Sequence, residues 1–224
     1  LKMPIAAIIW FYIGILLLIP IAIHGSYKYR MSRTSWRGIR FGYRGKRGEF
    51  FGLFFKELFF TIVSLGLYGA WFSMNIRNYV LSNIRFGNAE FRYRGRGSDY
   101  FLINIKGYFF TILTLGIYMF WWQKELFNYY INQLSLHHND QEIRFRSTAT
   151  GGDFAGLMIV NFFLLIITLG IGYPWILTRT LKFVFSKIEM TGNIDIDQLV
   201  QTESAYTDAT GEDISDMLDL GFVI

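Results

Sequence analysis

Three acidic residues recur at one position of the sequence and are the first candidates for chemistry. Glu49, Asp99 and Asp153 each stand at the start of a long apolar run. Carboxylates that recur in this way predict either a path for cations or protons or caps on the free N–H groups at helix starts. We favour capping, because acids are common at helix starts.

Two lysines recur seven residues after the first two acids. Lys56 and Lys106 lie inside apolar runs, where a charge is a candidate for function. Both lie within about two turns of the expected helix start, so their amines can reach lipid headgroups. Glu57, beside Lys56, is a candidate ion-pair partner. We favour lysines that reach the membrane surface over lysines that act on a substrate.

Other motifs offer little chemistry. The Arg-Gly segment 93–97 is similar to segments that bind RNA, but a basic turn near anionic lipid heads is the simpler interpretation. His137 and His138 fall short of the three or four ligands of a zinc site and predict a polar loop. The sequence has no Cys, and we find no catalytic triad or carboxylate pair with a catalytic neighbour. We therefore expect no enzyme activity, no catalytic, cofactor-binding or metal-binding residues, no cofactor and no nucleic-acid partner.

An internal repeat positions these residues. A shift of 50 residues brings segment 41–45 onto 91–95 and segment 64–68 onto 114–118, and a further shift of 54 reveals a third copy. Repeats at constant offsets indicate one structural unit used several times. The predicted parts are an N-terminal membrane segment with a partial repeat (1–38), three repeats (39–88, 89–140, 141–193) and an acidic tail (194–224).

Each repeat predicts strand, helix, glycine hinge, second helix and strand. Residues 39–43 alternate apolar and polar side chains, as strands do, and residues 84–93 predict a β-hairpin. The first helices are expected near 50–65, 100–115 and 154–169, and the second near 68–84, 118–134 and 174–187. The hinges between them are Gly66, Gly116 and Gly170, since glycine tolerates tight turns.

The composition predicts a membrane protein, with 52% hydrophobic and 19% aromatic residues. Two topologies are open: one span per repeat, such as 50–72, or a helical hairpin that enters and returns. We favour hairpins, because the basic blocks then all lie in the cytoplasm. The expected fold is mainly α and polytopic, with helical hairpins joined by cytosolic β-hairpins. The expected lipid-headgroup contacts are Arg44, Arg94, Trp71, Trp121 and Trp175.

The pattern resembles the YjgN-like family of bacterial membrane proteins of unknown function. The resemblance rests on segments 36–41, 114–118 and 190–197 and on the repeated Phe-x-Tyr-Arg-Gly. It implies a location in the bacterial inner membrane and no particular activity, and the repeats predict a multi-pass protein there with the strands and the C-terminal tail in the cytoplasm. The third copy departs from the pattern, because Ser147-Thr148-Ala149 replaces Tyr-Arg-Gly. Segment 3–23 predicts either one span or a helix pair broken at Pro20. The chain starts with Leu1, so we expect it to be part of a longer product.

The charge distribution suggests two surfaces with different partners. All 22 Lys and Arg lie in residues 1–187, whereas residues 188–224 hold nine acids and no base. The basic part is expected to meet anionic lipids. Residues 198–224, with a short helix predicted near 212–221, are expected to bind the chain itself, a second copy or another membrane protein. A membrane scaffold is the favoured function, and a solute or ion transporter with its path between repeats is the alternative.

Overall fold

The computed structural model describes residues 5–139, 141–192 and 199–202. Two compact units divide the chain. The first contains residues up to Arg92, His137–Asn139 and 199–202, and the second contains 93–136 and 141–192.

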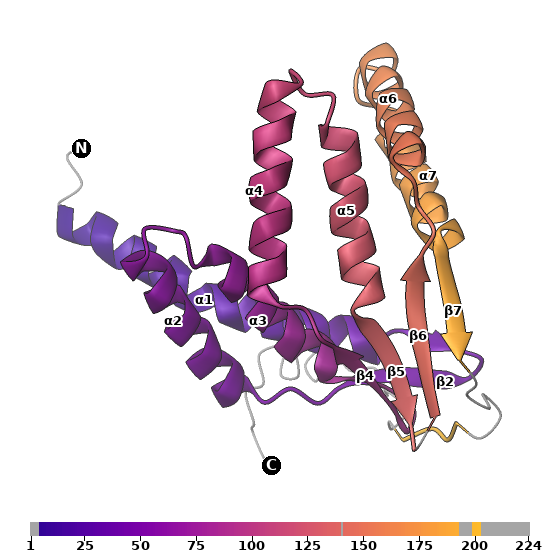
Figure 1. Ribbon diagram of the computed structural model, residues 1–224. Helices are drawn as coiled ribbons and strands as arrows, with labels where there is room; N and C mark the ends of the chain where they lie inside the picture. Colours follow the sequence, from indigo (N-terminus) through magenta and orange to yellow (C-terminus); the bar gives the residue numbers. More distant parts are fainter. Residues whose placement is uncertain (1–4, 140, 193–198, 203–224) are drawn as a thin grey trace. The chain divides into compact units, whose positions relative to one another are not determined.

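The first unit combines one long helix, one helix pair and short strands (Figure 1). Its elements are α1 (Ile5–Ser32), β1 (Ser35–Trp36), β2 (Ile39–Tyr43), α2 (Arg47–Val63), α3 (Gly69–Ser82), β3 (Ile84–Phe86) and β4 (Ala89–Tyr93, whose last residue belongs to the second unit). Its strands pair antiparallel in chain order, for example Phe41 opposite Phe86. The core of this unit lies where Phe50, Met74 and Val80 are buried.

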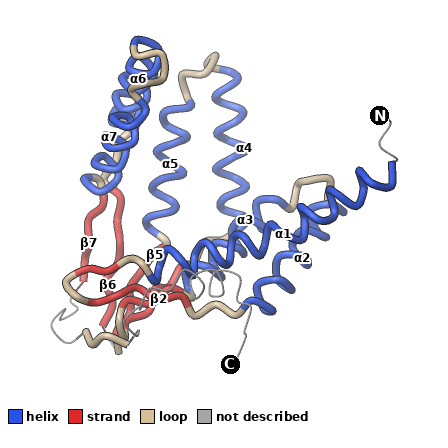
Figure 2. The backbone as a smooth tube through the Cα atoms, turned by 180° about the vertical axis from the view of Figure 1, so that it is seen from behind, coloured by secondary structure: helices blue, strands red, loops and turns tan. Residues whose placement is uncertain are grey.

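The second unit contains two helix pairs, each joined to strands. Its elements are α4 (Gly97–Leu113), α5 (Met119–Asn132), β5 (Leu134–His138, whose last two residues belong to the first unit), β6 (Gln141–Ser147), α6 (Gly151–Ile167), α7 (Tyr173–Ser186) and β7 (Ile188–Gly192). Figure 2 shows α4 beside α5 and α6 beside α7, with both pairs leading into strands. Strands β6 and β7 pair antiparallel, with Phe145 opposite Met190.

The repeat recurs in the backbone as well as in the sequence. Backbone N–H groups of Arg44, Arg94 and Thr148 donate to the carbonyls of Asn83, Gln133 and Lys187, at 2.9, 3.1 and 2.9 Å. Each bond joins the residues just before the first helix of a pair to the residue just after the second. Every pair is therefore closed at its strand end in the same way.

The expectation of a mainly α, polytopic membrane protein is wrong. Within the described residues, only α1 has a stretch long and apolar enough to cross a bilayer, Trp10–Ser32. The helices α2, α4 and α6 have 17 residues, and α3, α5 and α7 have 14. At 1.5 Å per residue, the longer set extends about 25 Å, short of the roughly 30 Å of hydrocarbon. The seven strands of the described residues also make β-structure a main part of the fold.

Several local expectations change as well. The first helix of each pair begins about three residues earlier than expected, so the recurring acids lie inside its first turn. Helix α1 runs unbroken through Pro20, which leaves one helix where a broken pair was the alternative. The predicted histidine loop is wrong, because His137 and His138 belong to β5. The tail helix near 212–221 lies outside the described residues.

Candidate functional site

Each helix pair has a free end, its hairpin tip, which exposes apolar side chains. The three hairpin tips are residues 64–69, 114–119 and 168–173. Leu65, Leu115 and Leu169 stand at their apices, 95%, 95% and 90% exposed. Each also has a positive φ, between 51° and 54°. This conformation costs a non-glycine residue about 1–2 kcal/mol. Each of the three hairpin tips thus holds a leucine side chain outward on a strained backbone.

The backbone of each tip satisfies its own N–H groups. In the first tip, the N–H of Gly66 donates to Thr61 and that of Leu65 to Ile62, the closure that ends many helices. The first tip is completed by bonds from Leu67 to Ser64 O (3.2 Å), from Tyr68 to Ser64 Oγ (2.9 Å) and from Gly69 to Gly66 O (3.0 Å). The same five bonds recur in residues 115–119 and 169–173, with Thr114 and Thr168 in the place of Ser64.

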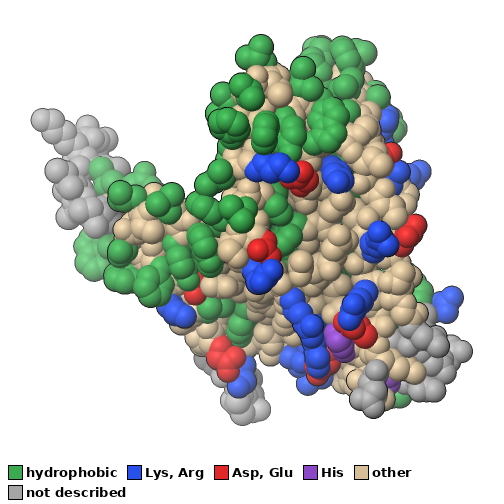
Figure 3. All heavy atoms as spheres, in the orientation of Figure 1, with side chains coloured by type: hydrophobic (Ala, Val, Ile, Leu, Met, Phe, Trp, Pro, Cys, Tyr) green, Lys and Arg blue, Asp and Glu red, His purple; other side chains and the backbone are tan. Residues whose placement is uncertain are grey.

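Such tips suit an apolar solvent better than water. Water satisfies the N–H groups of an ordinary surface turn, whereas lipid requires the chain to satisfy them itself. Figure 3 shows apolar side chains gathered over the free ends of α4–α5 and α6–α7 in the second unit. Burying one leucine side chain is worth about 1.5–3 kcal/mol, which offsets the strain at its φ.

The recurring acids lie at the opposite ends of the helix pairs, each in its own setting. Glu49 pairs with Lys46 at 3.0 Å, and Asp99 pairs with Arg96 at 3.0 Å. Neither α2 nor α4 has a side-chain cap. The phenol of Tyr129 instead bonds both the N–H and the carbonyl of Arg96, the N-cap of α4, and Tyr79 bonds Lys46 likewise in α2.

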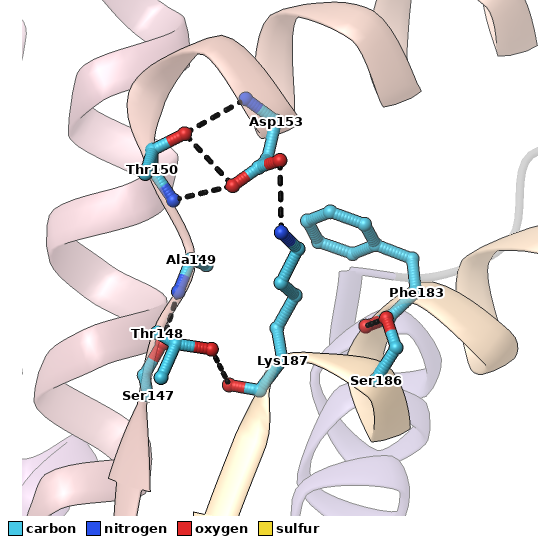
Figure 4. A network of polar contacts seen from close by, with 8 residues as sticks. All are labelled: Ser147, Thr148, Ala149, Thr150, Asp153, Phe183, Ser186 and Lys187. Atoms are coloured by element: carbon cyan, nitrogen blue, oxygen red, sulfur yellow. Dashed lines mark hydrogen bonds and ion pairs between the residues drawn. The ribbon is translucent and has the colours of Figure 1, made fainter.

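Asp153 has the most elaborate contacts of the three acids (Figure 4). It forms a capping box with Thr150, whose side chain accepts the N–H of Asp153 while the Asp153 carboxylate accepts the N–H of Thr150. Lys187, just after α7, donates to the same carboxylate at 2.9 Å. The Lys187 and Thr150 hydrogen bonds lower the pKa of Asp153 to about 2. In the position of Tyr129 the third pair has Phe183, which carries no hydroxyl, and the capping box provides the closure.

We expect Asp153→Asn to lower the thermal midpoint of the detergent-solubilised protein at neutral pH. The carboxylate has a folded pKa below its ordinary 3.8, so its contribution is present above that value and is lost as pH falls from about 4 to 2. The difference in thermal midpoint between the unsubstituted protein and Asp153→Asn should therefore disappear as pH falls through that window. Asp99→Asn is the control, with a smaller gap, because Arg96 is largely exposed. Equal losses in thermal midpoint for the two variants, or a loss in Asp153→Asn that does not change with pH, would contradict this role of Asp153.

Lys56 and Lys106 lie partway along α2 and α4 and are over half exposed. Lys106 pairs with Glu125 of α5 at 3.1 Å, and Tyr118 also donates to that carboxylate. Lys56 Nζ is 3.8 Å from Glu57, which is only 1% exposed.

Sequence reasoning missed the importance of Glu57 and Glu125. Asn75 of α3 donates to Glu57 at 2.8 Å, and at the matching depth of the third pair Asn161 donates to Thr180. The repeat offsets put Gly107 and Asn161 at the position of Glu57. The sequence signal that could have found these bonds is the presence of polar residues partway along otherwise apolar helices.

The remaining candidates take varied positions. Gly66, Gly116 and Gly170 occupy the tips with φ of 93°, 97° and 88°. Trp71 stacks on Tyr68, Trp121 lies against the start of α6 at Gly151, and Trp175 is exposed. Arg44 and Arg94 lie in the short links before α2 and α4. Within the described ranges, no cluster of three His, Asp or Glu side chains is placed to hold a metal ion.

Comparisons with known proteins give one match. A family model described as a bacterial protein of unknown function (DUF898) matches residues 2–95 and 119–217. No curated protein and no solved structure matches the chain.

Proposed function

We propose that this chain, which belongs to the bacterial family of unknown function DUF898, known as YjgN-like, is a non-enzymatic scaffold of the bacterial inner membrane. The hairpin tips carry the membrane location in this proposal, since they expose leucine and bond the N–H groups of Leu65 to Gly69 and their counterparts within the chain. In this proposal α1 spans the bilayer and the tips enter the lipid from the cytoplasmic side. The strands and the tail stay in the cytoplasm.

The helix lengths suggest how deep the tips reach. Lys56 and Lys106 each lie seven residues before the end of their helices, Val63 and Leu113, which corresponds to about 10 Å. One leaflet contributes about 15 Å of hydrocarbon. Lysine chains can span the difference to the phosphates, so the tips fit within one leaflet and the short helices need not cross.

The scaffold role draws on the segment that leads into the acidic tail. Val200 N–H donates to Asn88 Oδ1 at 3.1 Å, and Thr202 Oγ donates to the carbonyl of Gly87 at 2.8 Å. These bonds fix residues 199–202 on the β3–β4 turn of the first unit. Residues 198–224 hold six acids and no base, so the tail suits a basic partner or a second copy of the basic chain.

Truncation after Thr202 is expected to abolish assembly while the fold is kept, because residues 199–202 retain their contacts with Gly87 and Asn88. Two differently tagged copies, or the chain and another inner-membrane protein, would be co-purified from cross-linked membranes. We expect recovery to fall at least tenfold. A tail of equal length whose acids are replaced by Asn and Gln separates the effect of the acidic charge from the effect of tail length. Unchanged recovery from the truncated chain would count against the scaffold.

Transport is the second candidate, and the buried carboxylate of Glu57 favours it, because buried charge in a membrane protein often marks an ion path. Gly107 stands at the matching position of the second pair, next to the ring of Trp122, so the second pair has no carboxylate at that position. We expect no selective ion or solute flux in proteoliposomes. Flux that is abolished by Glu57→Gln but kept by Glu49→Gln would establish transport instead.

A further inference from the structure

A groove lies between α6 and α7 in the third helix pair. It has a volume of about 310 Å³ and is lined by Gly152, Asp153, Gly156, Leu157, Arg179 and Phe183. The two glycines create the space, because a Cβ at Gly156 would meet nothing within 4 Å and one at Gly152 would meet only Thr150, at 3.9 Å. The groove thus has one basic side, from Arg179, and one apolar side, from Leu157 and Phe183.

The charges in the groove favour an anion. Arg179 is exposed and makes no ion pair with any residue in the described part of the chain. Asp153 is the one acid in the lining, and Lys187 and Thr150 already occupy its carboxylate. The guanidinium is therefore the charge left to bind a ligand, and its planar donors match a phosphate group.

The repeat shows that this cation belongs to the third pair alone. The offsets of 50 and 54 residues align Arg179 with Glu125 and Asn75, which bond within their own pairs. Arg179 lies six residues after Tyr173 at the start of α7, about 9 Å from the tip end. Lys56 and Lys106 lie at nearly the same distance from their own tips, so the Arg179 side chain can reach the lipid phosphates in the way proposed for theirs.

We propose that this groove binds the phosphate of an anionic phospholipid, with Arg179 on the phosphate and Leu157 and Phe183 beside the start of the acyl chains. The inference rests on the proposed membrane location and adds a specific lipid partner to it. The volume suits a headgroup rather than a whole lipid.

The test is lipid retention by the purified full chain, measured by native mass spectrometry with phosphatidylglycerol and phosphatidylcholine. We expect preferential retention of phosphatidylglycerol, and at least a tenfold loss of it in Arg179→Gln, the size expected for a charged hydrogen bond. Gly156→Leu should cause the same loss by filling the groove without changing the charge. It should fold normally, because space is open there and leucine favours helices.

Lys182→Gln is the matched control, since it removes the same charge one turn along α7 but does not line the groove. Equal losses from the lysine and arginine variants would reduce the effect to general attraction and overturn the proposal. Displacement of the lipid by millimolar inorganic phosphate would overturn the lipid assignment in favour of a soluble phosphate. Unchanged retention in both groove variants, with the tips still in lipid, would refute the groove alone and leave the scaffold proposal standing.

Discussion

Replacing Leu65, Leu115 and Leu169 together by lysine is expected to expel the three hairpin tips from the bilayer. A lysine in hydrocarbon is about 3 kcal/mol less favourable than a leucine, which corresponds to more than a hundredfold in partitioning for each tip. Since the sequence contains no cysteine, a single cysteine at Ile117 can carry an environment-sensitive fluorophore. Lipids brominated along their chains should quench the unsubstituted protein strongly and the triple-lysine variant by less than about a tenth as much.

The matched control is the triple Leu→Met variant, which keeps the tips apolar and should keep the quenching. Dissolved iodide gives the opposite readout, because it reaches only labels exposed to water. If iodide quenches the label in the unsubstituted protein as fully as it quenches free dye, the tips lie in water. If a membrane-impermeant thiol reagent reaches the cysteine from the face opposite the strands, the hairpins cross the bilayer and the single-leaflet depth is wrong.

Phe50→Ala is expected to destabilise the first unit by about 3–5 kcal/mol, the range for a fully buried phenylalanine. The side chain is 0% exposed, and its ring lies 6.0 Å from His24 of α1 and 5.6 Å from Tyr79 of α3. The ring of Phe50 therefore packs α2 against both α1 and α3. Denaturant unfolding in detergent, followed by tryptophan fluorescence, measures the loss.

Phe59→Ala is the control for that substitution, because the residue is on the same helix but 62% exposed. We expect it to change stability by less than about 1 kcal/mol in detergent. Comparable losses from the two variants would mean that the core of the first unit does not lie at Phe50. If Phe59 faces lipid, the effect of Phe59→Ala should appear instead in the quenching by brominated lipids.

The sequence by itself determined the features that local chemistry controls. The offsets of 50 and 54 predicted the repeat, and the apolar runs broken at Gly66, Gly116 and Gly170 predicted helix pairs where the structure has them. Alternating side chains predicted strand β2. These signals are readable because glycine conformation, strand alternation and helix formation depend on residues close together in the chain.

The polytopic expectation failed because composition does not state where a helix ends. The one-span alternative counted 50–72 as a single run of 23 residues, yet Leu65 and Gly66 turn the chain back between α2 and α3. The favoured hairpins turn where expected, but their helices of 17 and 14 residues are too short to cross the bilayer. The histidine loop failed for a similar reason, since pairing with neighbouring strands determines that His137 and His138 are extended.

The tertiary structure alone decided which charged side chains meet. Glu49, Asp99 and Asp153 hold one position in the repeat, yet only Asp153 binds a basic residue from the far end of its helix pair. Glu57 is buried because Asn75 reaches it from the next helix, and Arg179 faces a groove because α6 has glycine at 152 and 156. Such contacts depend on how packed helices are rotated about their axes, and that rotation is set by side-chain packing across the pair rather than by the order of residues within one helix.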